Sequence, residues 1–349
     1  MTLGEYVRLL RRHRFGVAPA YWPRAAFMAG MSVLNSVFYR YETRVYGSDV
    51  ASAQIKPPFF ILGHWRSGTT YLHNLLATDT QFAYANIYQV LNPHTFLSTE
   101  RYSKILFISP KTRMMDNVRL NAGVPFEDEF ATCGTLHSPF LTWVFPHDGE
   151  QYNRYLTFRG VPEQEIAEWT EALVLFYKKL TWKYNRPLLL KSPPHTSRIK
   201  LLLAMFPDAR FVHIYRNPYI VFQSTQRQSQ VSMRTMGLQH LDVQHVDALI
   251  ISRYKIMYDA FFEECPLIPD GRFHELSFEE LEKDPVGQVR KIYDHLNVPG
   301  FDAMQPSLQR YVDSNVNYRK NAYPELSSSL RSEIGCAWQR NFEQWGYAR

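Results

Sequence analysis

Two hydrophobic patterns alternate along this chain. Short apolar runs lie at residues 59–62 and 187–190, and a third, mixed run lies at 209–215. Such runs predict strands that are buried on both faces. Apolar residues recur every three or four positions at 69–76, 163–183 and 199–206, which predicts amphipathic helices. Strands that alternate with helices predict an α/β protein with a parallel sheet, whose ligands lie beyond the carboxyl ends of the strands.

The N-terminal segment has a different pattern. Its apolar run, residues 25–38, lies between Arg24 and Arg40 and is shorter than the roughly 20 residues that cross a bilayer. No signal-peptide pattern follows the arginines of the first 14 residues. Two interpretations of residues 1–45 remain: a helical pair packed on the protein, which we favour, or an amphipathic element in peripheral contact with a membrane surface.

These patterns divide the chain into an N-terminal helical segment, residues 1–50, and an α/β domain, residues 51–349. Residues 46–58 are predicted to be the linker that leads into the first strand, because Gly47 and the pair Pro57-Pro58 are typical of loops.

The composition narrows the class of partner. The 349 residues are 45% hydrophobic and 21% charged, as in an ordinary globular protein with a large core. The net charge of +6 without a long basic block favours a small anionic partner over nucleic acid. Three cysteines, distant from one another, fit neither a disulfide framework nor a zinc site. We therefore predict a cytoplasmic protein without a signal peptide or a transmembrane helix.

A glycine-bounded loop follows the first apolar run, with the sequence Gly63-His64-Trp65-Arg66-Ser67-Gly68-Thr69-Thr70. Between a strand and a helix, its backbone N–H groups and the helix N-terminus can cradle a phosphate. A nucleotide P-loop would have a lysine after its second glycine. Here Thr69 occupies that position, and the only cation of the loop is Arg66.

Cations also follow the other two strands. Lys191 comes after residues 187–190, and Arg216 comes after residues 209–215. Asn217 is predicted to cap the next helix, with Pro218 at its first position. A kinase would need a carboxylate for Mg²⁺ at such a strand end, so we expect no metal site and a polyanionic ligand held by Arg66, Lys191 and Arg216.

The two arginine motifs resemble those of the sulfotransferases that use 3′-phosphoadenosine 5′-phosphosulfate (PAPS), and the resemblance runs from about Pro57 to the C-terminus. The loop is similar to the family's 5′-phosphosulfate loop in its Arg-Ser-Gly-Thr-Thr form, and Arg216-Asn217-Pro218 with Ser224 resembles the 3′-phosphate motif. The resemblance implies a P-loop-like three-layer fold with a central parallel sheet flanked by helices. It also implies PAPS as the sulfuryl donor. The donor would be bound by Gly63, Arg66, Ser67, Gly68, Thr69, Thr70, Arg216 and Ser224, and by Arg319 in a loosely similar basic loop.

The chemistry of sulfuryl transfer needs charge stabilisation and a base. Arg66 and Lys191 are candidates for stabilising the charge on the oxygens around the sulfur. His195 resembles a histidine that the family keeps near the sulfuryl group, although here it comes four residues after the lysine, and it is our first candidate for the base. The rival is a carboxylate of the segment Glu127-Asp128-Glu129, represented by Glu129, which lies between Phe126 and Phe130 and is therefore expected to be partly buried.

The acceptor cannot be inferred from these motifs. The aromatic-rich middle of the chain suits a hydroxyl or amine on a small molecule, sugar, lipid or peptide, and the oligomeric state is equally open. The alternatives to an enzyme of this kind are a non-catalytic nucleotide- or anion-binding P-loop-like module and, less favoured, a P-loop kinase.

Overall fold

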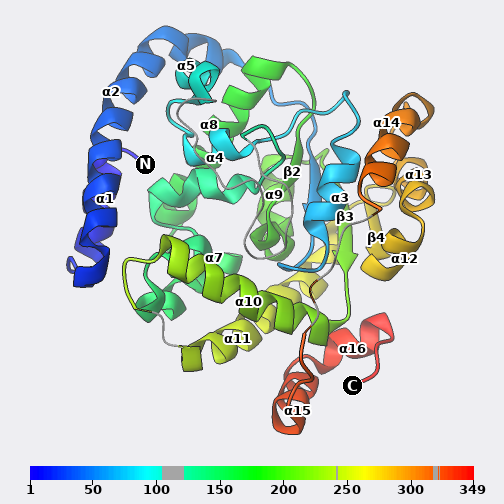
Figure 1. Cartoon of the computed structure of the whole chain (residues 1–349). Coiled ribbons are helices and arrows are strands. Elements are labelled where there is room, and N and C mark those ends of the chain that lie inside the picture. Colours follow the sequence, from blue (N-terminus) through cyan, green and yellow to red (C-terminus); the bar gives the residue numbers. More distant parts are fainter. Residues whose placement is uncertain (104–121, 241–242, 317–320, 322) are drawn as a thin grey trace. The chain divides into compact units, whose positions relative to one another are not determined.

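A computed structural model describes residues 1–103, 122–240, 243–316, 321 and 323–349 (Figure 1). The chain forms two compact units. Unit 1 comprises Met1–Lys56, Ala85–Asn185 and Ser229–Val246, and unit 2 comprises Pro57–Tyr84, Arg186–Gln228 and Asp247–Arg349. The predicted domain boundary at residue 50 stays a prediction. Within the described residues, no helix combines the length and apolar character needed to cross a membrane.

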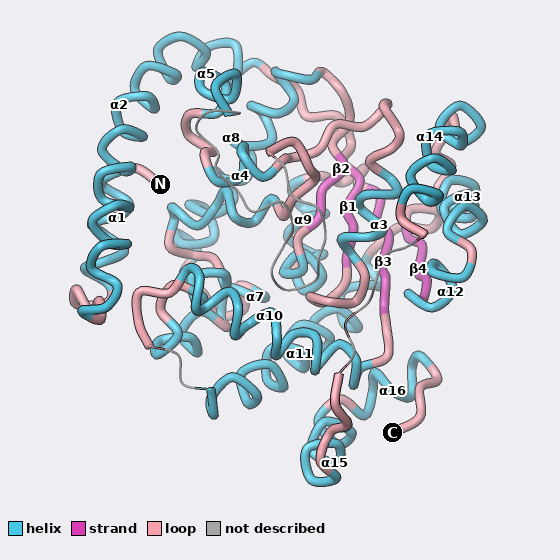
Figure 2. Tube along the Cα trace, viewed as in Figure 1, coloured by secondary structure: helices cyan, strands magenta, loops and turns pink. Residues whose placement is uncertain are grey.

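Unit 2 is built on a four-stranded parallel sheet in the order β2-β1-β3-β4 (Figure 2). Its strands are β1 (Phe59–Leu62), β2 (Leu189–Lys191), β3 (Arg210–Tyr215) and β4 (Phe273–Ser277). Its helices include α3 (Thr69–Leu76), α9 (Ile199–Met205), α12 (Phe278–Lys283), α13 (Pro285–His295), α14 (Phe301–Ser314), α15 (Ser328–Ala337) and α16 (Gln339–Trp345). The helices α10 (Pro218–Met236) and α11 (Val243–Glu264) contain residues of both units. The predicted α/β fold with a central parallel sheet is confirmed.

Strand β1 separates two apolar layers because successive side chains of a strand point to opposite faces. Phe59 and Ile61 belong to a buried cluster that includes apolar residues of α3, α13 and α14. Phe60 faces the other layer, where its ring lies 5.6 Å from that of Phe211 and 6.1 Å from that of Phe206. The sheet between two helical layers therefore gives the three-layer arrangement that the resemblance implied.

Unit 1 is largely helical. Its α-helices include α1 (Leu3–Arg12), α2 (Trp22–Ser52), α4 (Ile87–Leu91), α5 (Phe96–Thr99), α7 (Arg154–Thr157) and α8 (Glu163–Tyr184). The predicted linker is wrong in its first half, because α2 continues to Ser52. Packing overrides the loop signal of Gly47, since Val50 is buried and the ring of Tyr46 lies 5.1 Å from that of Trp182 in α8.

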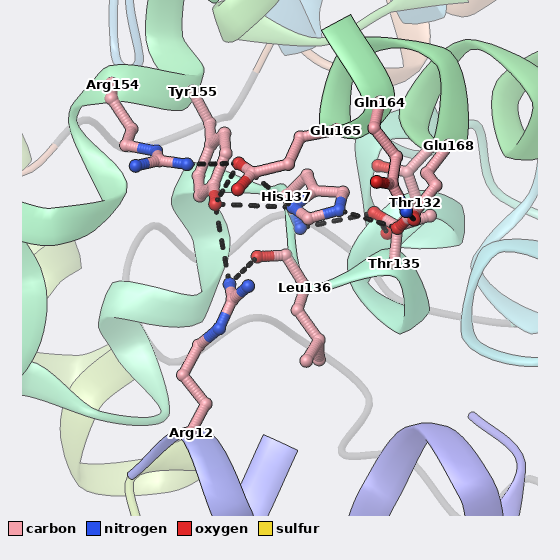
Figure 3. Close-up of polar contacts among 10 residues, drawn as sticks. All are labelled: Arg12, Thr132, Thr135, Leu136, His137, Arg154, Tyr155, Gln164, Glu165 and Glu168. Carbon is pink, nitrogen blue, oxygen red and sulfur yellow. Dashed lines mark hydrogen bonds and ion pairs between the residues drawn. The ribbon is translucent and has the colours of Figure 1, made fainter. Parts of the chain in front are cut away.

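A polar network fixes the end of α1 within unit 1 (Figure 3). Nη1 of Arg12 donates to the carbonyl oxygen of Leu136 at 2.7 Å and lies 3.5 Å from the hydroxyl of Tyr155. His137 lies between that hydroxyl, at 3.3 Å, and a carboxylate oxygen of Glu168, at 3.0 Å. Arg12 is therefore an anchor of α1.

Candidate active site

The loop after β1 depends on glycine at two positions. Gly63 has φ +143° and Gly68 has φ +104°, a region that residues with a side chain rarely adopt. A Cβ atom would lie 2.6 Å from the carbonyl oxygen of Ile214 at the first position, and 2.3 Å from Cδ2 of Phe278 at the second. Arg66 is also left-handed, with φ +71°, a conformation that costs about 1–2 kcal/mol for an L-residue. The loop is thus held in a tightly defined shape.

Hydrogen bonds from distant residues support this shape. N of Gly63 donates to Oγ1 of Thr196 at 2.7 Å, and N of His64 donates to the hydroxyl of Tyr258 at 3.3 Å. Oγ of Ser67 donates to the carbonyl oxygen of His64 at 2.9 Å, so this hydroxyl closes the loop on itself. The sequence analysis missed Thr196 and Tyr258, because no local pattern marks a side chain that contacts a loop more than a hundred residues away.

The cation of the loop contacts the second motif directly. Nε of Arg66 donates to Oγ of Ser224 in α10 at 2.8 Å. The hydroxyl of Tyr323 donates to the same oxygen at 2.9 Å, and Nδ2 of Asn321 lies 3.4 Å from that hydroxyl. A serine oxygen that accepts two hydrogen bonds still has its own proton to donate. The structure therefore joins the predicted 5′ and 3′ motifs, and Tyr323 is a further member that sequence reasoning missed.

Arg216 lies at the end of β3 over the ring of Phe278, with Cζ 4.1 Å from the ring centroid. Burial lowers the pKa of its guanidinium, the nearby charge of Arg66 lowers it further, and Glu279 and Glu282 oppose the change. Nε of Arg216 is buried and has no hydrogen-bond partner within the described part of the chain. A bound anion would satisfy this donor and relieve the repulsion between the two arginines.

The helix starts of both motifs agree with the sequence analysis. Oδ1 of Asn217 accepts from N of Tyr219 at 3.0 Å, the hydrogen bond of a helix cap, and α10 begins at Pro218. Thr69 and Thr70 are the first two residues of α3, whose N-cap is Gly68. Their N–H groups belong to the helix N-terminus, where an anion is favoured.

Lys191 and His195 are both placed beside the strand that carries the loop. Lys191 ends β2, lies opposite Ile61 of β1 and is 2% exposed. His195 belongs to the 3₁₀ helix η6 (Pro193–Ser197), is fully buried and lies with its ring edge against Phe60 at 5.5 Å. The next residue, Thr196, holds Gly63. The segment after β2 thus contacts the loop through Thr196, and the catalytic roles of Lys191 and His195 stay predictions.

The three adjacent carboxylates lie at the start of the 3₁₀ helix η3 (Asp128–Thr135) in unit 1. Asp128 and Glu129 are fully buried and Glu127 is nearly so, which confirms and exceeds the predicted partial burial. Oδ2 of Asp128 accepts from the hydroxyl of Tyr177 at 2.5 Å, so this carboxylate has a packing role. The role of Glu129 as a base stays a prediction, and Arg319 lies outside the described residues.

The chemistry of the site is cationic. In the part of the chain that the structure describes, no group of three or more His, Cys, Asp or Glu residues could hold a metal ion. Buried Lys191 ends β2 and largely buried Arg216 follows β3, the two strands that flank β1, and Arg66 lies in the loop after β1. Fold and site together define a P-loop-like α/β protein whose loop is surrounded by arginine and lysine.

Comparison with known proteins gives the family. The family model described as "Sulfotransferase family" matches residues 57–303, and the chain belongs to this family. Over its full length the chain is 37% identical to omega-hydroxy-beta-dihydromenaquinone-9 sulfotransferase Stf3 of Mycobacterium bovis, covering 90% of that protein. The protein of the same name from Mycobacterium tuberculosis gives the same values.

Solved structures confirm the fold. Sulfotransferase STF9 from Mycobacterium avium superposes with a TM-score of 0.76 at 18% identity, over 95% of this chain and 87% of that one. Sulfotransferase STF1 from Mycobacterium tuberculosis H37Rv gives a TM-score of 0.65 at 16% identity, over 97% of this chain and 90% of that one.

Proposed function

We propose that this sulfotransferase takes the sulfuryl group from PAPS and transfers it to a hydroxyl group of a lipid-like small molecule. The observation that carries the choice of donor is the hydrogen bond between Arg66 and Ser224. It joins a cradle for one phosphate-like group to a second motif for another anion, and PAPS is a nucleotide with anionic groups at both its 5′ and 3′ positions. The buried Nε of Arg216, which lacks a partner among the described residues, supports the same choice.

The donor supplies an activated sulfuryl group, and the protein positions and neutralises it. Gly68, Thr69 and Thr70 would hold the 5′-phosphosulfate through their backbone N–H groups and hydroxyls. Gly63 and Ser67 would shape the loop around it, because their own donors bind Thr196 and the carbonyl oxygen of His64. Arg216 and Ser224 would bind the 3′-phosphate, since an arginine fork and a serine proton are suitable donors. A contribution of Arg319 to that phosphate stays part of the proposal.

Transfer forms a bond between the acceptor oxygen and sulfur, and breaks the bond between sulfur and the oxygen that leaves with the phosphate. Arg66 and Lys191 would stabilise the negative charge that grows on the leaving oxygen. The imidazole of His195 would take the proton of the acceptor hydroxyl. Glu129 is the second candidate for this base.

The acceptor class comes from the relatives at 37% identity, which are named for a hydroxylated menaquinone. A hydroxyl at the end of an isoprenoid chain is therefore the acceptor that we propose for this protein. A lipid acceptor implies work at a membrane surface, and this supports the second interpretation of residues 1–45, in which they contact that surface. A cytoplasmic location stays a prediction.

The donor is tested by thermal unfolding with adenosine 3′,5′-bisphosphate and, separately, with ATP and Mg²⁺. We expect the bisphosphate to raise the melting temperature without added metal, because a ligand at 100 times its Kd stabilises a protein by about 2.7 kcal/mol. Transfer of radiolabelled sulfate from PAPS to an ω-hydroxylated isoprenoid quinone then tests the reaction. A response to ATP with Mg²⁺ alone would instead indicate a kinase.

A further inference from the structure

The long helix α2 exposes many large apolar side chains, whereas an ordinary surface helix buries its apolar side. The exposed large apolar residues of α2 are Trp22, Phe27, Met31, Val33, Leu34, Val37, Phe38, Tyr41 and Val45. Phe27 is 70% exposed and Val37 is 61% exposed. From Phe27 to Val45, six of them recur at intervals of four and three residues (27, 31, 34, 38, 41 and 45), which places them on one side of the helix. We call these nine residues the apolar face.

The side of α2 that faces the rest of unit 1 makes polar contacts. Buried Glu42 accepts from Nζ of Lys179 at 2.6 Å and from N of Ser98 at 3.0 Å. Oγ of Ser36 accepts from N of Leu3 at 2.8 Å, and Nδ2 of Asn35 donates to the carbonyl oxygen of Met1 at 3.2 Å. Rotating the helix to bury its apolar face would break the buried ion pair, which costs several kcal/mol. The orientation is therefore fixed.

The charges around the apolar face are positive. Arg40 and Arg44 are exposed and each follows a residue of the face, Val37 or Tyr41, by three positions, so they lie along its edge. In the neighbouring helix α1, which runs alongside α2 in Figure 1, Arg8 and Arg11 are exposed as well.

Two of the three carboxylates of this segment are already paired. Residues 1–52 contain Glu5, Glu42 and Asp49, and Asp49 is exposed near the C-terminal end of α2, four residues after Val45. Glu5 lies 3.0 Å from Nε2 of His94, and this contact holds its pKa down at about 2 against the opposing effect of burial. Glu42 is paired with Lys179. The surface that covers the apolar face must therefore be apolar in its interior and negative at its edge.

We propose that the apolar face of α2 docks the enzyme on an anionic lipid bilayer, with the helix axis parallel to the membrane surface. The apolar side chains would enter the boundary between head groups and acyl chains, and the arginines would contact lipid phosphates. The inference deepens the proposed function, because a lipid acceptor needs the enzyme at the bilayer.

A second copy of the chain fits this surface less well. In a symmetric dimer each protomer contributes the same patch, so both would bring Arg40 and Arg44 to one interface. The exposed carboxylate that each protomer would bring is Asp49 at the C-terminal end of α2, since Glu5 and Glu42 are paired with His94 and Lys179. Like charges facing each other across an interface are unfavourable, whereas an anionic lipid surface complements them.

The test is sedimentation of the full-length protein with vesicles of phosphatidylcholine, with and without 30% phosphatidylglycerol. We expect binding to the anionic vesicles that weakens as salt is added. The double variant Leu34→Glu/Val37→Glu should lose at least tenfold in partitioning, because it would place two charges in the acyl region. Leu267→Glu is the matched control, since Leu267 is an equally exposed leucine outside α2, and this variant should bind like the wild type.

The arginines give an independent readout. Arg40→Gln and Arg44→Gln should each weaken binding to anionic vesicles about fivefold and reduce its salt dependence. Circular dichroism of each variant should match the wild type, because all these side chains are exposed. Transfer to a short-chain, water-soluble hydroxyl acceptor should be unchanged.

Three outcomes would overturn the proposal: no binding of the wild type to anionic vesicles, equal binding by Leu34→Glu/Val37→Glu, or a wild-type dimer that this double variant converts to a monomer. The last result would assign the apolar face to a second copy. Failure of the proposed function is distinguishable, since it would appear as vesicle binding without sulfate transfer to any acceptor.

Discussion

Nε of Arg66 lies 2.8 Å from Oγ of Ser224, although 158 residues separate them in the sequence. The first residue belongs to the loop after β1, and the second lies in the helix after β3, which is the neighbouring strand. Parallel strands bring their carboxyl ends to one edge of a sheet, so two motifs recognised separately become one site. The contact also positions the guanidinium of a residue whose backbone is left-handed.

A double-mutant cycle on this pair should reveal coupling. Arg66→Lys keeps the charge but removes the Nε donor, and Ser224→Ala removes its acceptor. We expect each change to weaken binding of adenosine 3′,5′-bisphosphate about tenfold, with a coupling of about 1 kcal/mol, so that the double variant binds little worse than either single variant. Isothermal titration calorimetry measures the four dissociation constants. Ser232→Ala, on the same helix, should leave binding unchanged, and strictly additive effects would contradict the coupling.

Lys191→Ala should separate catalysis from binding. If Lys191 stabilises charge mainly in the transition state, its removal lowers kcat about 10²–10³-fold and changes bisphosphate affinity little. Steady-state kinetics with calorimetry on the same samples checks both quantities. Lys200→Ala is the control, because Lys200 is exposed on the following helix α9. Normal turnover in Lys191→Ala would show that Lys191 does not stabilise the transition state.

The identity of the base can be decided by comparing His195→Gln with Glu129→Gln. We expect His195→Gln to lower kcat at least 100-fold, because the proton acceptor is gone. Glu129→Gln should lower kcat much less. The reverse result would transfer the role to Glu129. Bisphosphate binding by both variants shows whether the site remains folded, since both side chains are fully buried.

Gly68→Ala should disrupt the loop. The alanine would have to adopt a left-handed backbone conformation, and its methyl group would lie 2.3 Å from a ring carbon of Phe278. We therefore expect a loss of at least 2–3 kcal/mol of stability. Bisphosphate binding should be lost as well. Gly160→Ala provides the comparison, because Gly160 has φ +67° with nothing within 4 Å. Gly160→Ala should cost only about 1 kcal/mol of stability, because the left-handed backbone conformation is its only penalty. Urea unfolding of both variants measures the difference.

His64 should make stability depend on pH. Its burial lowers the pKa to about 3, a hydrogen bond to the carbonyl of Trp65 opposes this change, and nearby Arg253 adds to it. Between pH 6.5 and 3 the unfolded chain binds a proton that the folded chain excludes. Stability is therefore lost as the pH falls through this range, with a slope of about 1.4 kcal/mol per pH unit.

The variant His64→Gln should show a flatter dependence of unfolding free energy on pH between about 6.5 and 4.5 than the wild type. His240→Gln, at an exposed position, should keep the wild-type slope. Chemical denaturation at a series of pH values measures both. Equal slopes for wild type and His64→Gln would show that this imidazole does not contribute.

Local patterns were sufficient for strands β1, β2 and β3, for the starts of α3 and α10, and for the loop. The apolar run at residues 59–62 marks β1, the threonines after Gly68 mark the start of α3, and Asn217 and Pro218 mark the start of α10. Each of these signals depends only on residues a few positions away. The helix α2 was harder. Gly47 and the prolines beyond it suggested a linker, whereas packing of Val50 and Tyr46 extends the helix to Ser52.

By itself the sequence determined the parallel α/β class, the glycine-bounded loop and the cations at the strand ends, because apolar periodicity and turn chemistry act over short distances. Only the tertiary structure decided which side chains meet: Ser224 with Arg66, Thr196 with Gly63, and Phe278 beneath Arg216. It also decided which side of α2 faces the protein. The apolar spacing of that helix is visible in the sequence, but its orientation depends on the buried partner of Glu42, a lysine 137 residues away.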